Sequence, residues 1–442
     1  MPDMIRPDTI YALATPAGEG GVAVIRISGP AALQIMKGCF PRIRNIQPRR
    51  VYVGRVCRED MSPIDEAVVF YMAAPKSYTR EDVVEIQCHG GLICARRVME
   101  RIAELGARTA EPGEFTRRAF ENGRISLDQA EAVMELIAAK SQAAARAALR
   151  QMENGGGMSK IRRRVIELLS DISAADDFPE EVEEPVLRSD LEDGMREIIA
   201  SLRRASDPRS ARMARDGAIV ALSGCPNVGK SSLMNAILGC ERAIVDAEAG
   251  TTRDVLSERV TTDGRLFTLM DTAGQRQNAG RVEMAGIVRA LEAEKNADAV
   301  VAVLDLSREM TNDDLELLSR RDERFLIVEN KSDLPAAREP VEGAFLVSAK
   351  KGDGVDALLR AILDKTQVSN TEEVLTAPRQ LELAGRAAAE VEHALENMLM
   401  GDPADLAAIP LWEAARLLGE ITGEEASEAV IEAVFERFCV GK

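Results

Sequence analysis

The sequence predicts a multidomain protein of mixed α/β and α+β class: an N-terminal α+β domain, an all-α helical domain, and an α/β domain with a mainly parallel sheet inserted into the helical one. The first observation is length, because 442 residues suffice for about three domains with cores of their own. The second is that short apolar runs alternate with helical patterns in one central stretch. The third is that amphipathic helical patterns lie on both sides of that stretch.

The N-terminal domain is predicted over residues 1–121. Strand-like runs bounded by turn residues alternate there with two short helical patterns, which is typical of an α+β domain. Residues 1–124 hold 18 Lys and Arg against 15 Asp and Glu, a balance of +3, whereas the whole chain carries −17. The acidity therefore lies outside this domain. A basic surface over the whole protein, as in non-specific nucleic-acid binders, is excluded, whereas a local basic patch is not.

The all-α domain is predicted in two parts, residues 122–213 and 370–442. Both parts show apolar residues at helical spacing, which predicts amphipathic helices. In the first part this spacing begins at Leu127, Ala130 and Val133. We expect the two parts to complete each other's core.

The inserted α/β domain is predicted over residues 214–369. Continuous apolar runs alternate with helical patterns there, and such runs indicate parallel strands buried on both faces of a sheet. The runs are Ala218–Leu222, Leu266–Met270, Ala299–Leu304, Phe325–Val328 and Ala344–Val347.

The cysteines and the N-terminal residues exclude several other classes. The seven cysteines have no C-x-x-C spacing, and the chain has only two histidines, so neither a disulfide framework nor a zinc cluster is expected. The N-terminal residues lack the pattern of a signal peptide, and no stretch approaches 18 consecutive apolar residues. We expect a soluble cytoplasmic protein without a membrane partner.

A phosphate-binding loop is predicted at Gly224–Ser231, which matches G-x-x-x-x-G-K-[ST] between a predicted strand and a predicted helix. Backbone N–H groups of such a loop surround phosphates, with Lys230 adding a positive charge and Ser231 a hydroxyl ligand for Mg²⁺. This domain is therefore expected to be a Ras-like P-loop nucleotide-binding domain.

Further motifs follow in the order found in GTP-binding domains. Asp271–Gly274 ends one strand and places a carboxylate beside the metal. Asn330–Asp333 ends another, and the Asp333 carboxylate can accept from the paired N–H donors of guanine, which adenine lacks. Ser348–Lys350 ends the last strand as a loop facing the base. Gly250–Asp254 lies where a first switch is expected, and Thr252 can close onto Mg²⁺.

The residue that orients the attacking water is left open between two candidates. Gln275 follows Gly274 directly, where Ras-like enzymes place a water-orienting glutamine. Glu283 lies farther along the second switch and could orient water or act as a base. No arginine finger is identifiable from the sequence.

Several strings together resemble the MnmE (TrmE) family of tRNA-modifying GTPases, within the TrmE-Era-EngA-YihA-Septin-like GTPases, over essentially the full chain. The C-terminal FCVGK is the most discriminating, because other bacterial GTPases share the nucleotide motifs but not this ending. The other strings are ATPAGEGGVAVIRISG, EDVVEIQCHGG, EPGEFTRRAFENGRISLDQAEAV and GTTRD.

The resemblance implies a folate site in the first domain, which would also mediate homodimerisation. Arg26, Glu85 and Arg124 would bind a reduced folate, either 5,10-methylenetetrahydrofolate or 5-formyltetrahydrofolate, and Lys442 would reach it from the C-terminus. Cys439 would be the catalytic thiol. Arg124 stands where family members generally carry Lys, so the charge is kept but the ammonium geometry is not.

For the GTPase domain the resemblance implies Mg²⁺ on Ser231 and Thr252, and K⁺ in the space of an arginine finger. Glu283 would orient the water. Two departures from the family pattern are Asp246, where Thr or Ser is usual, and Gln275, where an apolar residue is usual. The K⁺ ligands would be Asn227, Asp246, Glu248 and Thr251. The GTP-binding residues would be Asn227, Val228, Gly229, Lys230, Ser231, Ser232, Asp246, Ala247, Glu248, Ala249, Gly250, Thr251, Thr252, Asp271, Thr272, Ala273, Gly274, Asn330, Lys331, Asp333, Ser348, Ala349 and Lys350.

The function implied is modification of tRNA. With an FAD-dependent partner of the MnmG type, in a heterotetramer, such a GTPase adds an aminomethyl or carboxymethylaminomethyl group at C5 of the wobble uridine, position 34, of certain tRNAs. The folate supplies the carbon, and glycine or ammonium the nitrogen. Two alternatives remain: a ribosome-assembly GTPase without modification chemistry, and a folate-dependent methyltransferase regulated by its GTPase domain.

Overall fold

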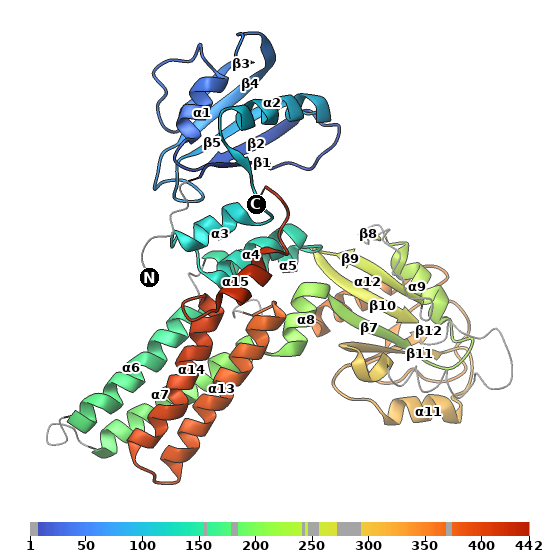
Figure 1. Cartoon of the computed structure of the whole chain (residues 1–442). Helices are drawn as coiled ribbons and strands as arrows, with labels where there is room; N and C mark the ends of the chain where they lie inside the picture. The colour runs from blue at the N-terminus through green and yellow to red at the C-terminus, as the bar shows by residue number, and fades with distance from the viewer. Residues whose placement is uncertain are drawn as a thin grey trace. The chain divides into compact units, whose positions relative to one another are not determined.

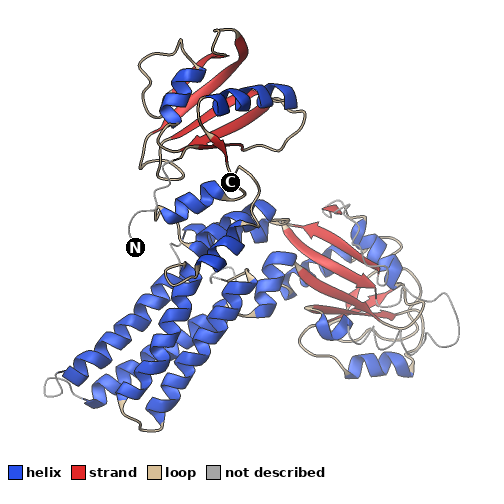
Figure 2. Cartoon of the chain, viewed as in Figure 1, coloured by secondary structure: helices blue, strands red, loops and turns tan. Residues whose placement is uncertain are grey.

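The computed structural model describes residues 8–153, 157–177, 184–240, 244–245, 256–271, 293–367 and 374–441. The chain forms two compact units, and each combines segments that are distant in the sequence. The first unit comprises Met1–Met134, Gln151–Ile199 and Arg386–Lys442. The second comprises Glu135–Arg150 and Ala200–Gly385. Each unit contains one sheet (Figures 1 and 2).

The sheet of the first unit has six strands in the order β3-β4-β5-β2-β1-β6. Its strands pair antiparallel, except that β1 pairs with β6 in parallel. The strands are β1 (Ile10–Leu13), β2 (Val22–Ser28), β3 (Val51–Cys57), β4 (Pro63–Met72), β5 (Val83–His89) and β6 (Arg108–Thr109).

Helices α1 (Ala32–Cys39) and α2 (Leu92–Glu104) cover one face of this sheet. Successive strand side chains point to opposite faces, so alternate residues such as Ile25 and Ile27 of β2 enter the core. Met36 of α1 and Ile102 of α2 pack against them and are fully buried. The residues between, such as Arg26, therefore lie on the opposite face.

The helical part of the first unit joins segments from before and after the second sheet (Figure 1). Helix α14 packs against α6, and Arg162 of α6 donates to the backbone oxygen of Ala415 at 3.1 Å. The bounds are α3 (Glu114–Glu121), α4 (Leu127–Ala138), α6 (Gly157–Asp177), α7 (Glu184–Ala205), α13 (Pro378–Leu399), α14 (Ala404–Thr422) and α15 (Glu428–Phe435). Helices α4, α7 and α13 each extend past the bounds of the first unit into residues of the second.

The C-terminal segment packs against the beginning of this helical part. Phe435 of α15 contacts Phe120 of α3, with ring centroids 6.1 Å apart, and both belong to a core that includes Leu127. Val440 then forms an antiparallel bridge with Pro112. The last described residues thus lie beside a segment more than 300 positions earlier in the chain.

The sheet of the second unit has seven strands in the order β13-β12-β11-β7-β10-β9-β8. All pairs from β10 through β7 to β13 are parallel, whereas β9 and β8 are added antiparallel. The strands are β7 (Ala218–Ser223), β8 (Ile244–Val245), β9 (Leu256–Thr262), β10 (Arg265–Asp271), β11 (Ala299–Asp305), β12 (Phe325–Asn330) and β13 (Phe345–Leu346). The predicted mixed α/β class with a mainly parallel sheet is confirmed.

Helices flank this sheet, and β11, which lies next to the central strand β7, is buried at every residue. Leu233 and Ile237 of α9 and Leu358 of α12 pack into the same core as Val220 and Val301 of the strands. The helices that the described residues form in this unit include most of α5 (Gln142–Glu153), together with α8 (Pro208–Asp216), α9 (Lys230–Leu238), α11 (Asn312–Ser319) and α12 (Val355–Lys365). Among the described residues, none of the helices has the length and apolar character needed to cross a membrane. The domain boundaries predicted above remain predictions.

Candidate functional site

The predicted phosphate loop joins the end of β7 to the first residue of α9. Gly224 and Gly229 have φ angles of +149° and +96°, in the region that favours glycine. A Cβ at Gly224 would lie 2.3 Å from the backbone oxygen of Val303, and one at Gly229 would lie 2.3 Å from Nδ2 of Asn330. Both positions therefore require glycine, which lets the loop backbone turn over the sheet edge.

Lys230 is held against the loop itself. Its Nζ donates to the backbone oxygens of Gly224 at 2.6 Å and Cys225 at 2.8 Å, and the residue is only 5% exposed. These bonds fix the ammonium at the loop, where a phosphate oxygen would accept from it.

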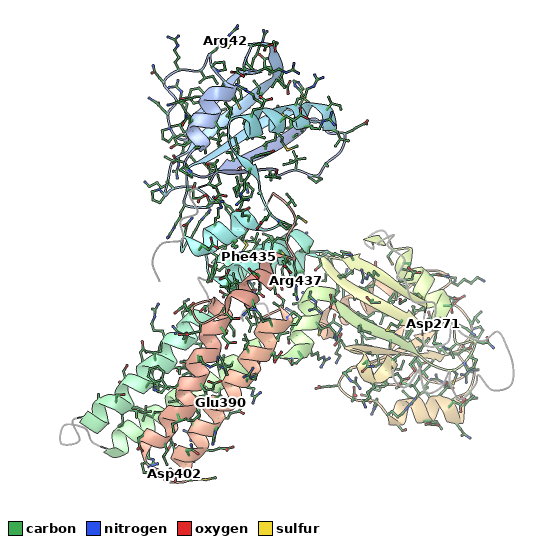
Figure 3. All side chains as sticks on the ribbon, in the orientation of Figure 1. Arg42, Asp271, Glu390, Asp402, Phe435 and Arg437 are labelled. Atoms are coloured by element: carbon green, nitrogen blue, oxygen red, sulfur yellow. The ribbon has the colours of Figure 1, made fainter. Side chains whose placement is uncertain are left out.

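Ser231 and Asp271 meet although 40 residues separate them. The Ser231 hydroxyl donates to Oδ2 of Asp271 at 2.8 Å, because the first turn of α9 lies beside the end of β10. Asp271 is buried and is labelled in Figure 3. Hydroxyl and carboxylate oxygens are suitable ligands for Mg²⁺, so this pair fits the predicted metal.

Asn330 connects the phosphate loop to the predicted base loop. Its Nδ2 donates to the backbone oxygen of Val228 at 2.8 Å, and its Oδ1 accepts from the backbone N–H of Ala349 at 3.0 Å. The side chain is buried, so both halves of its amide are satisfied within the protein.

The two other named residues of the Asn330–Asp333 turn are also held by side chains. Lys331 contacts Asp305 with Nζ and Oδ2 2.6 Å apart. Asp333 accepts a hydrogen bond from the Ser348 hydroxyl at 2.8 Å, and this bond holds the pKa of Asp333 below its ordinary value. The Asp333 carboxylate is thus kept ionised as an acceptor.

Asp305 was not among the predicted site residues. Burial raises its pKa, but hydrogen bonds from Lys331 and Ser307 outweigh burial and lower it overall. Its position offered a signal, because it ends β11 as Asp271 ends β10 and Asn330 ends β12. Carboxyl ends of parallel strands are where ligands bind in such sheets.

Part of the predicted nucleotide site lies outside the described residues. This applies to both candidates for the water-orienting residue, Gln275 and Glu283. It also applies to Asp246, Ala247, Glu248, Ala249, Gly250, Thr251, Thr252, Thr272, Ala273 and Gly274. Lys442, which was predicted to bind the folate, also lies outside the described residues.

The first domain brings three predicted residues together on the face of its sheet opposite α1 and α2. Arg26 and Glu85 are directly opposite on β2 and β5, with Nε and Oε1 2.8 Å apart. Two guanidinium groups lie over the Tyr78 ring, with that of Arg26 5.4 Å and that of Arg124 4.9 Å from the ring centroid. We call Arg26, Tyr78, Glu85 and Arg124 the first-domain site.

Two residues near this site were not predicted. Tyr78 lies between β4 and β5, outside any strand or helix. Phe115 is a buried residue of α3, and its ring lies 5.7 Å from the Arg26 guanidinium. The Arg124 guanidinium also donates to the backbone oxygen of Ser77 at 3.1 Å, which fixes it beside Tyr78. Contacts between these groups depend on tertiary packing rather than on a local motif.

Cys439 lies in the C-terminal segment that returns to the first domain. Its side chain is exposed, and its backbone oxygen accepts from the N–H of Gly113 at 3.4 Å. A Cβ at Gly441 would lie 2.3 Å from the backbone oxygen of Leu13 in β1. The thiol is therefore carried by a segment that passes beside β1, the neighbour of β2.

These features define a class of protein. A glycine-bounded phosphate loop between a strand and a helix, a hydroxyl and carboxylate pair beside it, and an Asn-Lys-Ser-Asp turn at another strand end form a P-loop GTPase. Two family models also match the chain, GTP-binding protein TrmE N-terminus over residues 9–124 and MnmE helical domain over residues 127–439. The chain belongs to the MnmE family of tRNA modification GTPases, and it is a GTP hydrolase.

Full-length relatives agree with this assignment. The tRNA modification GTPase MnmE of Parasynechococcus marenigrum is 43% identical over 448 residues, covering 98% of this chain and 99% of the relative. The protein of the same name from Geobacter sulfurreducens is 40% identical over 456 residues, with the same shares covered. Among solved structures, the G domain of the T. maritima FeoB iron transporter matches 34% of this chain and 99% of its own at 25% identity, with a TM-score of only 0.25.

Proposed function

We propose that this chain, acting in the cytoplasm with an FAD-dependent partner of the MnmG type, adds an aminomethyl or carboxymethylaminomethyl group at C5 of uridine 34 in certain tRNAs. A reduced folate supplies the carbon. The observation that carries the proposal is the first-domain site, which lies in the same chain as the GTP site and beside the segment that bears Cys439. A GTPase that served only as a switch would have no use for such a site.

The first-domain site matches the groups of a folate. A pterin ring presents N–H donors, and a carboxylate such as that of Glu85 accepts from such donors. Arg26 is paired with Glu85 and would position that carboxylate, whereas Arg124 can pair with a carboxylate of the glutamate tail. The residues present therefore fit 5,10-methylenetetrahydrofolate or 5-formyltetrahydrofolate, with Lys442 as a further ligand.

In the GTP site, Lys230 and the loop backbone bind phosphates, and Asp333 accepts from guanine. Ser231 and Thr252 would hold Mg²⁺, and the bound ion would supply positive charge beside the phosphates. Asn227, with a φ angle of +64°, lies in the loop where a K⁺ ion would contact it, together with Asp246, Glu248 and Thr251. Glu283 orients the attacking water, and Gln275 is the competing candidate.

Cys439 is the proposed thiol for the carbon chemistry, and only its thiolate form is a nucleophile. GTP hydrolysis does not perform that chemistry. It drives opening and closing of the GTPase domains, because GTP and GDP favour different conformations of the switch segments.

A homodimer through the first domain is part of the proposal. Val22, Val51 and Val53 lie on the sheet face opposite α1 and α2, and their side chains are 57%, 62% and 68% exposed. Exposed apolar side chains on one sheet face are typical of a protein interface. Two such chains and two partner chains would form the heterotetramer.

Nucleoside mass spectrometry of tRNA tests the proposal. A strain lacking this protein is expected to accumulate uridine without the C5 group at position 34, and the gene encoding the intact chain restores the modification. Arg26→Ala is expected not to restore it, whereas Arg58→Ala, a change at an exposed arginine of the same domain, restores it fully. Unchanged wobble nucleosides in the deletion strain would instead support a ribosome-assembly GTPase.

A GTPase-dead variant tests the other alternative, a folate-dependent methyltransferase that the GTPase domain merely regulates. Glu283→Ala is expected to abolish both GTP turnover and modification. If modification survives in this variant at the wild-type level, GTP hydrolysis is not required and the regulated methyltransferase is favoured.

A further inference from the structure

One end of the helical part exposes a group of large apolar side chains. Met400 is 79% exposed, Ile409 70%, Trp412 62%, Leu399 57% and Leu406 44%. Of the 17 large apolar side chains that are exposed in the described part of the chain, these five fall within 14 consecutive positions. We call them the apolar tip. Single exposed apolar residues are ordinary, whereas a gathered set marks an interaction surface.

The tip is built on rigid elements. Leu406, Ile409 and Trp412 follow at intervals of three on α14, which places them on one side of the helix. Ala407, Leu411 and Ala414 are buried on the opposite side, where α14 packs against α6. The tip therefore faces away from the core of its own unit.

The loop between α13 and α14 is also fixed. The Arg188 guanidinium of α7 donates to the backbone oxygens of Met398 at 2.7 Å and Asp402 at 2.9 Å. Figure 3 labels Asp402 at this end of the two helices. A surface held in place in this way needs little ordering when a partner binds, which favours affinity.

The surroundings of the tip are acidic. Residues 387–415 contain no Lys or Arg, and their acidic residues are Glu390, Glu392, Glu396, Asp402, Asp405 and Glu413. Glu413 is paired with Arg416 at 2.7 Å, and Arg188 is engaged by the backbone oxygens described above. Asp402 and Asp405 lie between the apolar residues of the loop and those of α14.

The negative charge around the apolar tip excludes some classes of binding partner and favours another. The phosphates of tRNA and the headgroups of an anionic bilayer would be repelled, because fields of exposed charges extend about 8 Å at physiological ionic strength. A second copy of the same tip would bring carboxylates against carboxylates. A protein segment with apolar side chains flanked by Lys or Arg is complementary to both features.

We propose that the apolar tip docks a basic amphipathic segment of the FAD-dependent partner protein. This inference rests on the proposed function, which supplies that partner. Trp412 and Ile409 are the central contacts, because large aromatic and aliphatic side chains that become fully desolvated carry most of the affinity in protein interfaces. Asp405 contributes attraction to the basic flank.

The test is binding of the purified FAD-dependent partner to the full-length protein, measured by biolayer interferometry. The double variant Ile409→Ser with Trp412→Ser is expected to raise Kd by about tenfold or more. Leu315→Ser is the matched control, because Leu315 is an apolar residue of α11 that is 54% exposed. The Kd of this variant for the partner is expected to equal that of the wild type. Asp405→Asn is expected to raise Kd by about threefold and to reduce the dependence of Kd on salt.

Each remaining outcome overturns the inference. If the wild type binds the partner and the double variant binds it equally, the tip is not the docking surface although the proposed function stands. If the wild type does not bind the partner, the proposed partnership fails as well. If the double variant loses tRNA affinity without the partner, or changes from dimer to monomer in solution, the occupant is RNA or a second copy. Unchanged GTP turnover and circular dichroism of the variants establish that they are folded.

Discussion

The GTP site lies at the carboxyl ends of parallel strands, whereas the first-domain site lies on the face of an antiparallel sheet. In the GTP site each strand end delivers one short motif, and adjacent motifs contact each other through Ser231 and Asp271 or through Asn330 and Val228. The first-domain site instead gathers single residues from β2, from β5, from the segment before β5 and from the segment after α3. The comparison shows that a site at strand ends is built from short sequence motifs. A site on a sheet face is built from single residues that are far apart in the sequence.

The largest expected effect concerns a buried ion pair whose two residues, Glu329 and Arg338, lie on either side of the Asn330–Asp333 turn in the sequence. Glu329 is fully buried and accepts both Nη atoms of Arg338, at 2.8 and 2.7 Å. Arg338→Ala leaves this carboxylate buried without its cation, so we expect the second unit to lose about 3–5 kcal/mol of stability. Native-state hydrogen exchange of β12 measures this loss. Arg96→Ala, which breaks an exposed pair with Glu100 in the first unit, is expected to cost less than about 1 kcal/mol. Equal losses in the two variants would contradict the prediction.

Lys230→Ala is expected to impair the GTP site and leave the first-domain site unchanged. Removing the ammonium from the phosphate loop is expected to lower the rate of GTP hydrolysis about a hundredfold, because a fixed charge at the transferred phosphate is lost. Binding of 5-formyltetrahydrofolate, followed by calorimetry, is expected to be unchanged. Lys351→Ala, at an exposed lysine beyond the base loop, serves as the control and should retain full turnover. A parallel loss of folate binding would mean that the two sites are not independent.

Arg26→Ala is expected to have the opposite effect, impairing the first-domain site and leaving the GTP site unchanged. We expect affinity for 5-formyltetrahydrofolate to fall about tenfold, the loss typical of one charge-assisted hydrogen bond, while GTP turnover stays at the wild-type rate. The same calorimetric titration measures it, with Arg58→Ala as control. An unchanged affinity would remove Arg26 from the site.

The smallest expected effect is a shift with pH in the GTP site. The Ser348 hydroxyl lowers the pKa of Asp333, so the carboxylate stays ionised, and accepts from guanine, to lower pH than an ordinary aspartate. Ser348→Ala removes this hydrogen bond and raises the pKa of Asp333 toward its ordinary value. As pH falls from 7 toward 4, affinity for a fluorescent GDP analogue is expected to decline at higher pH in the variant than in the wild type. The difference is expected to reach a few fold near the ordinary aspartate pKa of about 4. Coincident pH profiles would contradict this role of Ser348.

The contrast between sites built from local motifs and sites built from distant residues also explains which features could be predicted from the sequence. The parallel strands were predicted because burial on both faces demands continuous apolar runs such as Ala299–Leu304, and the fold class is confirmed. Strand β9 was not predicted, since its sequence LSERVTT mixes polar and apolar residues near the sheet edge. In the GTP site Ser231 contacts Asp271, and Asn330 contacts Val228 and Ala349. Asp305 could have been identified from its place at the end of a strand.

The first-domain site shows the limit of such reasoning. Arg26, Glu85 and Arg124 were expected there from the resemblance to a family, not from spacing. Tyr78 and Phe115 approach Arg26 because α3 and the segment before β5 pack against the same sheet face. No local sequence pattern predicts these contacts. Where a site depends on packing between distant segments, the sequence reveals its members only after the fold is known.

The return of the C-terminal segment to the first domain has a consequence for synthesis of the chain. The ribosome makes Leu13 and Pro112 long before it makes Val440 and Gly441, which pack against them. At about 5–20 residues per second, the GTP-binding half is complete well before this closing segment leaves the ribosome. A chain that terminates early would carry every described nucleotide contact and lack the segment that bears Cys439. The first domain therefore gains these contacts only after the strands of the GTP-binding sheet have been synthesised.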